Sequence, residues 1–532
     1  MIAPALLAAL MMTTPASGPG GPQDGLIVDR GRLDRAAPLP DASERAPLSP
    51  EAASAEAPIA PFVLRAVDIR TAPAVEGEIR RAVEPFIGET LDLNGLARLR
   101  AAVSGALGQH AALPIVAIDT RESASGLVRI TAAPGKVGRV AIYGDTDPDV
   151  ELLRQYAGRL AAEAPLTRET SERYLSLVAD IPGAKTTLES VPSATPGAVD
   201  LGFDVNFSRW VFETDINNRG SQALGRTQFT GAIILNGGFR MGDQTRLALT
   251  VPTDPDRFQY LSLSHRQPIG GDGMAVTLSA GRLRTRVDGL DGDATSFGGV
   301  VSWPMIRSYR RNLVLSAGLD GLDSDNAVFG NLVATEKVRA LRGSAAYGLT
   351  GPRSSLNASL TLSRGIDGLG AEVDPTAEAD FTKVNGRIDG ARAFGRSVRV
   401  SGALAMQYSE DRAPTAELFS LGGTDFGRGF GSGLLVGDSG YGAKIETAWR
   451  PGFTPRPFAG SEVYAFADGG EVRVNARGPL AEQTESLMSA GAGVRIAIAD
   501  RVMIELEGAR AVDDPRPQGG GTRFGFALSA RF

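Results

Sequence analysis

Apolar and polar residues alternate along short segments from about residue 209 to residue 532, and no helical period interrupts them. The segment 246–251 is typical, since Leu247, Leu249 and Val251 fall on one face. The arrangement recurs at 274–280, 313–319 and 398–406, with turn signals such as Asn236-Gly237-Gly238 between segments. Because successive side chains of a strand point to opposite faces, this alternation predicts a long series of β-strands.

The preceding region, residues 62–208, mixes strand and helix periods in one order that occurs twice. The first copy is expected to hold strands and helices at 62–69, 75–86, 93–107, 116–120 and 126–132, and the second at 136–143, 149–162, 168–180, 186–191 and 198–207. Two units of about 70 residues with one element order form an internal repeat. The order β-α-α-β-β resembles that of POTRA domains, so we expect one POTRA domain at 62–133 and a second at 134–208.

The N-terminal residues 1–18 hold a short apolar core, from Ile2 to Met12, followed by small residues. This pattern predicts a secretory signal peptide that is cleaved after Ala16 or Gly18, although no lysine or arginine precedes the core. Residues 19–61 are rich in proline and alanine and show little apolar period, which predicts a linker. We therefore expect an exported protein.

Alternation alone leaves two all-β folds open for residues 209–532. In a soluble sandwich the apolar faces meet in a core, whereas in a membrane barrel they face lipid and the lumen is polar. The last strand favours the barrel, because one of its faces carries Phe524, Phe526, Leu528, Ala530 and Phe532, the final residue. This resembles the C-terminal targeting strand of bacterial outer-membrane barrels, which ends in an aromatic residue and would be presented to the barrel-assembly machinery for insertion.

Length agrees with a barrel. Residues 209–532 are 324 in number, and sixteen strands would leave about 20 residues for each strand and its connection, enough for a span of ~9–11 residues. The predicted fold class is therefore α+β POTRA repeats followed by an all-β transmembrane barrel of sixteen antiparallel strands in outer-membrane lipid.

Composition excludes several functions. The chain has no cysteine and two histidines, His110 and His265, which removes thiol chemistry, disulfides and iron–sulfur clusters and leaves little support for a histidine metal site. A net charge of −6 argues against nucleic acid as a partner. No nucleophile and base, paired carboxylates or phosphate-binding loop shows a recognisable spacing. We expect no enzyme, no cofactor and no metal.

One stretch stands apart from the strands, namely LGGTDFGRGFGSGLLVGDSGYGAKIE at 421–446. Nine glycines in 26 residues are incompatible with a helix or an ordinary strand interior, so they predict a long loop. The loop contains a single arginine, Arg428, between Gly427 and Gly429. Asp438 and Glu446, which flank its return strand, are expected to be solvated or lumenal without a particular partner.

Two POTRA-like units before a barrel with a late Gly-rich loop resemble the two-partner secretion transporters (TpsB; the ShlB/FhaC/HecB hemolysin secretion/activation family) of the BamA/TpsB superfamily. The resemblance covers residues 62–532. In that superfamily a loop folds into the lumen with a V/I-R-G-F/Y tip, whose arginine meets the aspartate of an F-x-D-x-G segment on the wall. The tip corresponds here to Arg428, Gly429 and Phe430, and the wall segment to Phe466, Asp468 and Gly470.

The tip departs from the family pattern at Gly427, where relatives have an aliphatic residue. An Arg428–Asp468 pair in a partly occluded lumen would be a charge-assisted contact, stronger than the same pair on a surface. Such a contact would hold the loop across the pore and still allow its release.

The resemblance implies a transporter that binds an unfolded, β-rich exoprotein of the hemolysin or adhesin type in the periplasm and passes it through the barrel. Exposed POTRA strand edges would hold the client by β-augmentation. One alternative is a factor that inserts other barrel proteins, as BamA and TamA do, but those carry three or more POTRA domains. A second alternative, a porin-like diffusion channel, would need neither POTRA domains nor a pinned loop.

Overall fold

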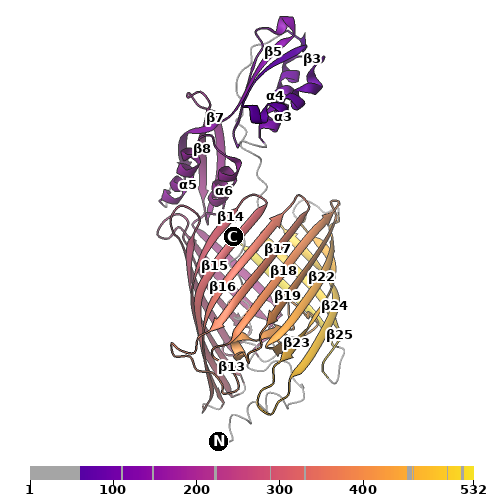
Figure 1. Ribbon diagram of the computed structural model, residues 1–532. Coiled ribbons are helices and arrows are strands. Elements are labelled where there is room, and N and C mark those ends of the chain that lie inside the picture. The colour runs from indigo at the N-terminus through magenta and orange to yellow at the C-terminus, as the bar shows by residue number, and fades with distance from the viewer. Residues whose placement is uncertain are drawn as a thin grey trace.

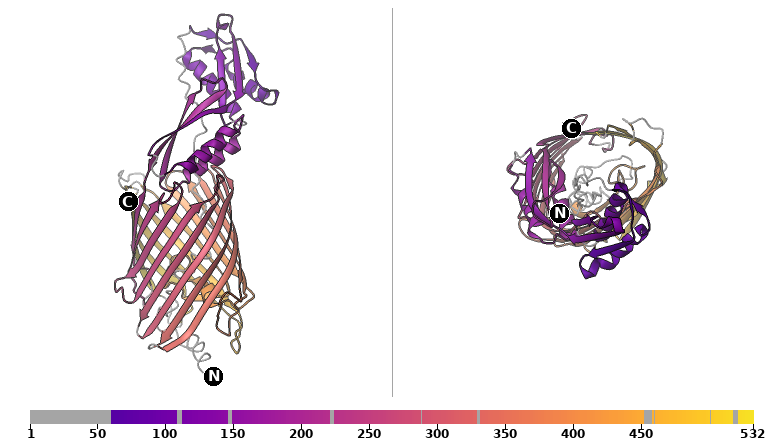
Figure 2. Two further views of the ribbon diagram at one scale, coloured as in Figure 1. Left: turned by 90° about the vertical axis from the view of Figure 1, so that its left-hand side faces the viewer. Right: turned by 90° about the horizontal axis from the view of Figure 1, so that it is seen from above.

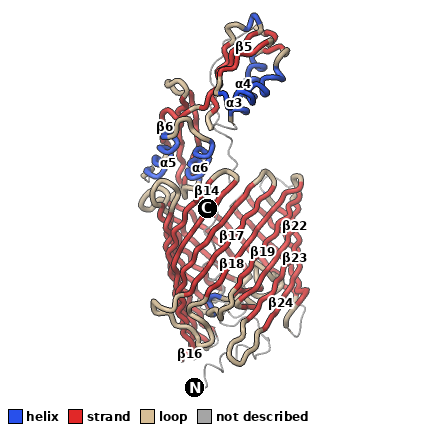
Figure 3. The backbone as a smooth tube through the Cα atoms, viewed as in Figure 1, coloured by secondary structure: helices blue, strands red, loops and turns tan. Residues whose placement is uncertain are grey.

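The computed structural model describes residues 60–108, 112–145, 149–220, 224–287, 289–328, 331–451, 458, 460–499, 501–516 and 521–532, so the expected signal peptide and most of the expected linker lie outside the described residues. Two small α/β units stand in line above one end of a β-barrel (Figure 1). Figure 3 shows that the helices are confined almost entirely to these two units, apart from a short turn of helix in the barrel. No helix in the described ranges is long and apolar enough to cross a membrane.

The first unit packs two helices against a three-stranded sheet in the order β2-β5-β4, with β2 parallel and β4 antiparallel to β5. Its elements are β1 (Phe62–Val63), β2 (Ala66–Arg70), α3 (Pro73–Val83), η1 (Glu84–Phe86), β3 (Thr90–Leu91), α4 (Leu93–Leu107), β4 (Pro114–Asp119), η2 (Ser123–Ser125) and β5 (Leu127–Pro134). Helix α4 begins at the cap Asp92, whose side chain accepts a hydrogen bond from the Gly95 N–H. Its apolar stripe, Leu96, Leu99 and Val103, is buried against the sheet.

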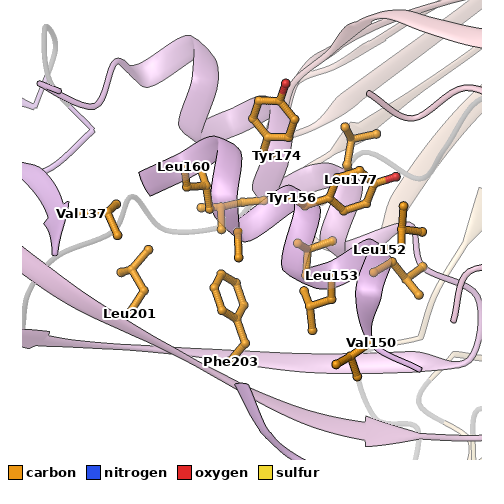
Figure 4. Close-up of a cluster of buried hydrophobic side chains, with 14 of the residues drawn as sticks. Val137, Val150, Leu152, Leu153, Tyr156, Leu160, Tyr174, Leu177, Leu201 and Phe203 are labelled. Atoms are coloured by element: carbon orange, nitrogen blue, oxygen red, sulfur yellow. The ribbon is translucent and has the colours of Figure 1, made fainter. Parts of the chain in front are cut away.

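The second unit repeats this arrangement with β6 (Lys136–Gly144), α5 (Glu151–Ala162), α6 (Arg168–Ala179), β7 (Ala184–Pro192) and β8 (Ala198–Phe207). Its sheet has the order β6-β8-β7, with β6 parallel to β8. Figure 4 shows the core, in which Leu153, Tyr156 and Leu160 of α5 face Leu201 and Phe203 of β8. The second unit thus has the element order predicted from the sequence, and the first has it with two further short strands, β1 and β3, which pair with each other.

Sixteen antiparallel strands of the described chain close into a barrel, which confirms the predicted fold class. They are β9 (Trp210–Asn217), β10 (Gln228–Asn236), β11 (Gln244–Pro252), β12 (Phe258–Pro268), β13 (Ala275–Val287), β14 (Leu290–Arg307), β15 (Arg311–Val328), β16 (Asn331–Thr350), β17 (Ser354–Gly365), β18 (Thr382–Phe394), β19 (Val398–Tyr408), β22 (Ser439–Trp449), β23 (Glu462–Val474), β24 (Gln483–Ile498), β25 (Val502–Asp513) and β26 (Thr522–Arg531). Seen from above, the strands form a closed ring (Figure 2).

The alternation in the sequence places apolar side chains on the outside of this ring. Leu247 and Leu249 of β11 remain about half exposed at 44% and 45%, whereas the intervening Ala248 is buried at 4%. Polar side chains pair on the inner face, where the Thr230 and Thr250 hydroxyls lie 2.9 Å apart. Exposed leucines outside and hydrogen-bonded polar groups inside are typical of a membrane barrel, and they exclude a soluble sandwich.

The C-terminal strand β26 closes the ring against β9. Five residue pairs join these two strands, from Ala527↔Asn217 to Arg531↔Glu213. Phe532 and Phe212 then exchange both backbone hydrogen bonds at 2.9 Å. The aromatic end of the chain is therefore part of the seam between the first and last strands, and its ring stays exposed toward the outside.

The second unit is attached to the barrel rim by buried polar contacts. The Arg307 guanidinium at the end of β14 donates two hydrogen bonds of 2.7 Å to the Asp180 carboxylate, which follows α6. Tyr174 of α6 donates to Asp272 in the β12–β13 turn at 2.8 Å, and Met241 of the β10–β11 turn is buried among the apolar side chains of the unit. These contacts fix which end of the barrel faces the α/β units.

Candidate functional site

The long connection between β19 and β22, residues 409–438, starts at the barrel end away from the α/β units and folds into the lumen. Two short paired strands, β20 (Phe419–Leu421) and β21 (Leu435–Gly437), divide it. We call residues 409–421 and 435–438 the stem and residues 422–434 the tip. Apolar side chains of the connection pack against the inner wall of the barrel. Leu421, Phe426, Phe430 and Leu435 are buried together with Val472, Leu487 and Ala511 of the wall.

Two glycines shape the tip around Arg428. Gly427 has a φ of 92°, in the left-handed region that favours glycine, and a Cβ there would lie 2.6 Å from Cδ1 of Leu487. At Gly429 a Cβ would lie 2.9 Å from Cβ of Ser489 and 3.0 Å from the backbone nitrogen of Ala511. Glycine at these two positions lets the backbone turn and approach the wall closely, so Gly427 suits this tip where relatives have an aliphatic residue.

The Arg428 guanidinium is shared among carboxylates from several strands. Its Nη1 and Nη2 donate to Oε2 of Glu446 on β22 at 3.2 and 3.1 Å, and Nη1 also donates to Oε2 of Glu507 on β25 at 2.9 Å. The guanidinium lies over the Phe466 ring of β23 with Cζ 4.0 Å from the ring centre. Cation–π stacking and two carboxylates together hold a cation that has lost most of its water.

Asp468 lies next to Arg428, as the sequence suggested, but binds the tip chiefly through the backbone. Nε of Arg428 is 3.4 Å from Oδ2 of Asp468, an ion-pair contact without hydrogen-bond geometry. Both carboxylate oxygens instead accept from the Arg428 N–H at 3.3 Å, and Oδ1 also accepts from the Ser489 hydroxyl. The Gly429 N–H donates to Oγ of Ser489 at 3.1 Å. Asp468 therefore orients the turn more than it neutralises the arginine.

The expectation that Glu446 has no particular partner is wrong. Glu446 is buried and accepts from Arg428 and from Arg495, whose Nη1 lies 2.6 Å from its Oε1. Arg495 on β24 also donates to Glu505 at 2.8 Å and to Glu462 at 2.9 Å. Every second residue of a strand faces the lumen, so charged side chains from β22 to β25 meet here. These contacts could not be expected from the sequence, in which Glu446 flanks a loop.

Asp438 is likewise buried and paired, contrary to expectation. It accepts from Arg477 at 2.6 Å, from the Ala413 N–H at 2.7 Å and from the Asn475 N–H at 2.8 Å. These donors come from the stem and from the segment after β23. Asp438 therefore ties the two ends of the stem to each other and to the neighbouring hairpin.

The remaining predicted residues also meet at the tip. Phe430 is buried, and its carbonyl oxygen accepts a hydrogen bond from Arg523 of β26. Cζ of Arg516 lies 5.5 Å from the centre of the Phe430 ring. Gly470 pairs with Gly442 on β22. A Cβ added at Gly442 would lie 2.5 Å from the Phe426 ring. Gly442 thus leaves room for the Phe426 ring of the loop, whereas Gly470 lets β23 lie close to the backbone of β22.

Sequence reasoning did not find Ser489, Arg495, Glu507 and Arg523, which sit on three other strands. The one available signal was the polar face of β25, where Glu505 and Glu507 alternate with Ile504 and Leu506. A cavity of about 160 Å³ lies beside the tip, between Arg428 and Arg523. Among the described residues no group of histidine, aspartate and glutamate side chains has the arrangement of a metal site.

A sixteen-stranded barrel with a lumenal loop and two N-terminal α/β units is the architecture of an outer-membrane β-barrel protein. The family described as haemolysin secretion/activation protein ShlB/FhaC/HecB matches residues 202–496, more than half of the chain. The chain belongs to this family, and it is an outer-membrane β-barrel of the TpsB secretion/activation type. The family is one of transporters rather than enzymes.

Solved structures share the fold. CdiB from Escherichia coli aligns with a TM-score of 0.67 at 18% identity, over 100% of this chain and 99% of its own. CdiB from Acinetobacter baumannii aligns with a TM-score of 0.62 at 13% identity, over 99% and 96%. BamA from Haemophilus ducreyi lacking POTRA domains 1–3 gives 0.55 at 14% identity, over 89% and 100%. A comparison with curated proteins found no match.

Proposed function

We propose that the two α/β units act as POTRA domains that bind an unfolded exoprotein in the periplasm, and that the barrel translocates it once the loop at 409–438 leaves the lumen. The observation that carries this proposal is the position of Arg428. A tip buried in the lumen and held by Glu446, Glu507 and Asp468 occupies the path that a polypeptide would take. The client is a secreted, β-rich protein of the hemolysin or adhesin type.

The second unit offers a surface for an extended client. Within the described residues, strand β6 pairs only with β8 and so is an edge of the sheet. A groove of about 640 Å³ lies between β6 and α5 and is lined by Val140, Ile142 and Ala157. An extended segment paired with β6 would place alternate side chains in this groove, which is the geometry of β-augmentation.

The opposite face of that sheet is less suited to a client. Tyr143 of β6 lies over Gly202 and donates a 2.5 Å hydrogen bond to Glu189 of β7, and this bond raises the pKa of Tyr143 to about 12. The phenol therefore stays protonated and bridges the two edge strands across β8. We place the client on the α5 side of β6.

The contacts at the tip suit a reversible closure. Each carboxylate around Arg428 is itself bonded to the wall, so withdrawal of the tip leaves no carboxylate without a donor: Glu446 keeps Arg495, Asp468 keeps Ser489 and Glu507 keeps Tyr464. Release then costs the contacts of one arginine and its neighbouring apolar residues. Folding of the client outside the cell would supply the free energy for transport.

The substitution Arg428→Ala tests this function. It removes the hydrogen bonds of the shared cation to Glu446 and Glu507, and because one hydrogen bond to a charged group contributes about 1.5–3 kcal/mol, the ratio of open to closed channels should rise at least about tenfold. We expect larger and longer openings in planar bilayers. The exoprotein that disappears from the medium when this chain is deleted should not return on complementation with the variant.

Arg364→Ala is the matched control, because this arginine pairs with Asp380 where both side chains are more than half exposed. It should insert, conduct and secrete as the parent does. Normal closure and secretion by Arg428→Ala would refute the gating role. If deletion of the chain depleted other outer-membrane barrels and left secretion intact, barrel assembly would be the better function.

A further inference from the structure

Three arginines of strand β13 point out of the barrel in one row. Arg282, Arg284 and Arg286 alternate with Leu283 and Thr285, which are buried on the inner face, so the three guanidinium groups share the outer face. The side chains of Arg282 and Arg286 are 74% and 55% exposed, and Arg284 is exposed as well. We call these three residues the arginine row. Its neighbouring members lie about 7 Å apart along the strand.

The arginine row begins where the apolar outer surface of the barrel ends. Leu278 precedes it on the same face of β13 and is exposed. Leu261 of β12 is exposed and pairs in register with Arg282, and the exposed ring of Phe297 on β14 lies near the same level. Because the β12–β13 turn contacts α6, strand β13 runs from there to the barrel end away from the α/β units (Figure 1). The row therefore lies at headgroup depth on the outer side of the membrane.

Outward-facing cations of the strands farther along the ring are neutralised within the chain. Each has a carboxylate within hydrogen-bond distance. The pairs are Lys337–Glu372 at 3.0 Å, Arg339–Asp323 at 2.6 Å and Arg364–Asp380 at 3.2 Å. These cations of β16 and β17 therefore have little charge left for an external ligand.

The arginine row lacks such close partners. Nη2 of Arg282 lies 3.9 Å from Asp293, and Nε of Arg286 lies 3.8 Å from Asp291, both beyond hydrogen-bond distance. Within the described ranges Arg284 forms no ion pair, and none of the three guanidinium groups donates a hydrogen bond. Each guanidinium carries five N–H donors. The row thus offers its donors to an acceptor outside the chain.

The acidic neighbours of the row lie on one side only. Both aspartates belong to β14. On β12 the row faces Gln259 and Leu261, which carry no charge. An anionic headgroup can therefore lie over β12 and β13, with its acyl chains beside the exposed leucines and its charge on the arginines.

We propose that the arginine row binds the phosphate groups of lipid headgroups in the outer leaflet. A guanidinium matches two oxygens of one phosphate, and basic residues at a membrane surface attract anionic lipids. A row that adjoins the apolar band places its donors at the depth of those headgroups, whereas a free phosphate ion would gain nothing from the adjoining leucines. Bound headgroups would hold the β12–β14 side of the barrel at a fixed depth. The site lies outside the lumen and is independent of the proposed transport.

Replacement of the row tests the site in the full-length protein. The row variant combines Arg282→Ser, Arg284→Ser and Arg286→Ser. Each protein is purified in detergent, with heat-modifiable mobility on gels as the check of barrel folding. It is then titrated with synthetic diphosphorylated lipid A, with the same lipid without its phosphates, and with inorganic phosphate. Native mass spectrometry measures the lipid bound to each barrel.

The control variant combines Arg353→Ser, Arg392→Ser and Arg396→Ser. It removes three exposed arginines from β18 and from two turns at the opposite end of the barrel, with the same change in net charge. We expect the parent protein and the control variant to bind diphosphorylated lipid alike, and the row variant to bind it at least about tenfold more weakly. The lipid without phosphates should bind weakly to all three proteins, and inorganic phosphate in excess should displace no lipid.

Equal binding of diphosphorylated lipid by the row variant and the parent protein would overturn the proposal. Equal losses in the row and control variants would overturn it too, because net charge alone would then explain binding. Displacement of the lipid by inorganic phosphate at equal concentration would assign the row to free phosphate instead. If the row variant does not fold, Arg284→Ser is compared with Arg392→Ser, and an affinity loss of about fivefold is expected for Arg284→Ser alone. Channel closure and secretion by the row variant should match the parent protein.

Discussion

At the scale of single residues, Arg428 acts through a set of partners and not through one pair. The family resemblance implied that it meets Asp468, and the two are in contact, but the hydrogen bonds of the guanidinium go to Glu446 and Glu507. Asp468 accepts from the backbone of the tip instead. Removal of Asp468 should therefore disturb the shape of the turn, whereas removal of Arg428 removes the charge that holds it.

Gly427 provides a test at this scale. Gly427→Val puts a β-branched side chain at a φ of 92° and against Leu487, a strain of about 1–3 kcal/mol against the closed tip. We expect more frequent channel openings than in the parent protein, measured as open probability in planar bilayers. Gly431→Ala is the control, since its added Cβ would meet only Nη1 of Arg523 at 3.9 Å. Unchanged closure by Gly427→Val would show that the tip does not need this backbone conformation.

At the scale of elements, helix α5 and edge strand β6 form the groove that we assign to the client. Both were predicted from periodicity in the sequence to within a few residues, because their apolar faces follow the periods of 3.6 and 2. The groove itself was not predictable, since its width depends on how α5 crosses the sheet. Small residues on the exposed side of α5, among them Gly158, keep it open.

Gly158→Leu tests the groove. No atom lies within 4 Å of the Cβ that it would add, so the leucine fills the groove without strain and favours the helix by about 1 kcal/mol. We expect normal insertion and closure but at least tenfold less exoprotein in the medium, by quantitative immunoblot. Gly105→Leu in α4 makes the same change at an open helical glycine of the first unit. Full secretion with Gly158→Leu would place client binding elsewhere.

At the scale of the whole molecule, the second unit and the barrel form one assembly through a buried interface. The Arg307 side chain is 1% exposed and donates hydrogen bonds to both carboxylate oxygens of Asp180. Leu177 of α6 also lies close to Gly273 of the β12–β13 turn, where a Cβ would be 2.6 Å from it. A unit fixed in this way would present a bound client, as we propose, at one position on the rim of the barrel.

Asp180→Ala should release the second unit. It removes the carboxylate that accepts two hydrogen bonds from Arg307 across the interface, and we expect faster cleavage near residue 208 in limited proteolysis together with reduced secretion. Arg159→Ala is the control, because its pair with Asp272 is about half exposed on both sides and worth little. Parental proteolysis of Asp180→Ala would show that apolar contacts alone hold the interface.

Several features were fixed by the sequence alone. The change from two repeated β-α-α-β-β units to dyad alternation at residue 209, together with the aromatic face of the last strand, indicated the fold class, and the length agreed with sixteen strands. The contact between Arg428 and Asp468 was implied by the resemblance of two short motifs to those of the family. These features are local: each depends on the period of side chains along one segment or on the spacing within one motif.

Only the tertiary structure decided which charges meet. Arg428 of the loop meets Glu446 on β22 and Glu507 on β25, and Glu417 of the loop meets Arg342 and Lys383 on two other strands. Inside a closed barrel every second residue of sixteen strands faces the same lumen, so many ion pairs are compatible with the pattern. Strand register and the path of the loop select among them, and both are set by contacts across the barrel rather than along the chain.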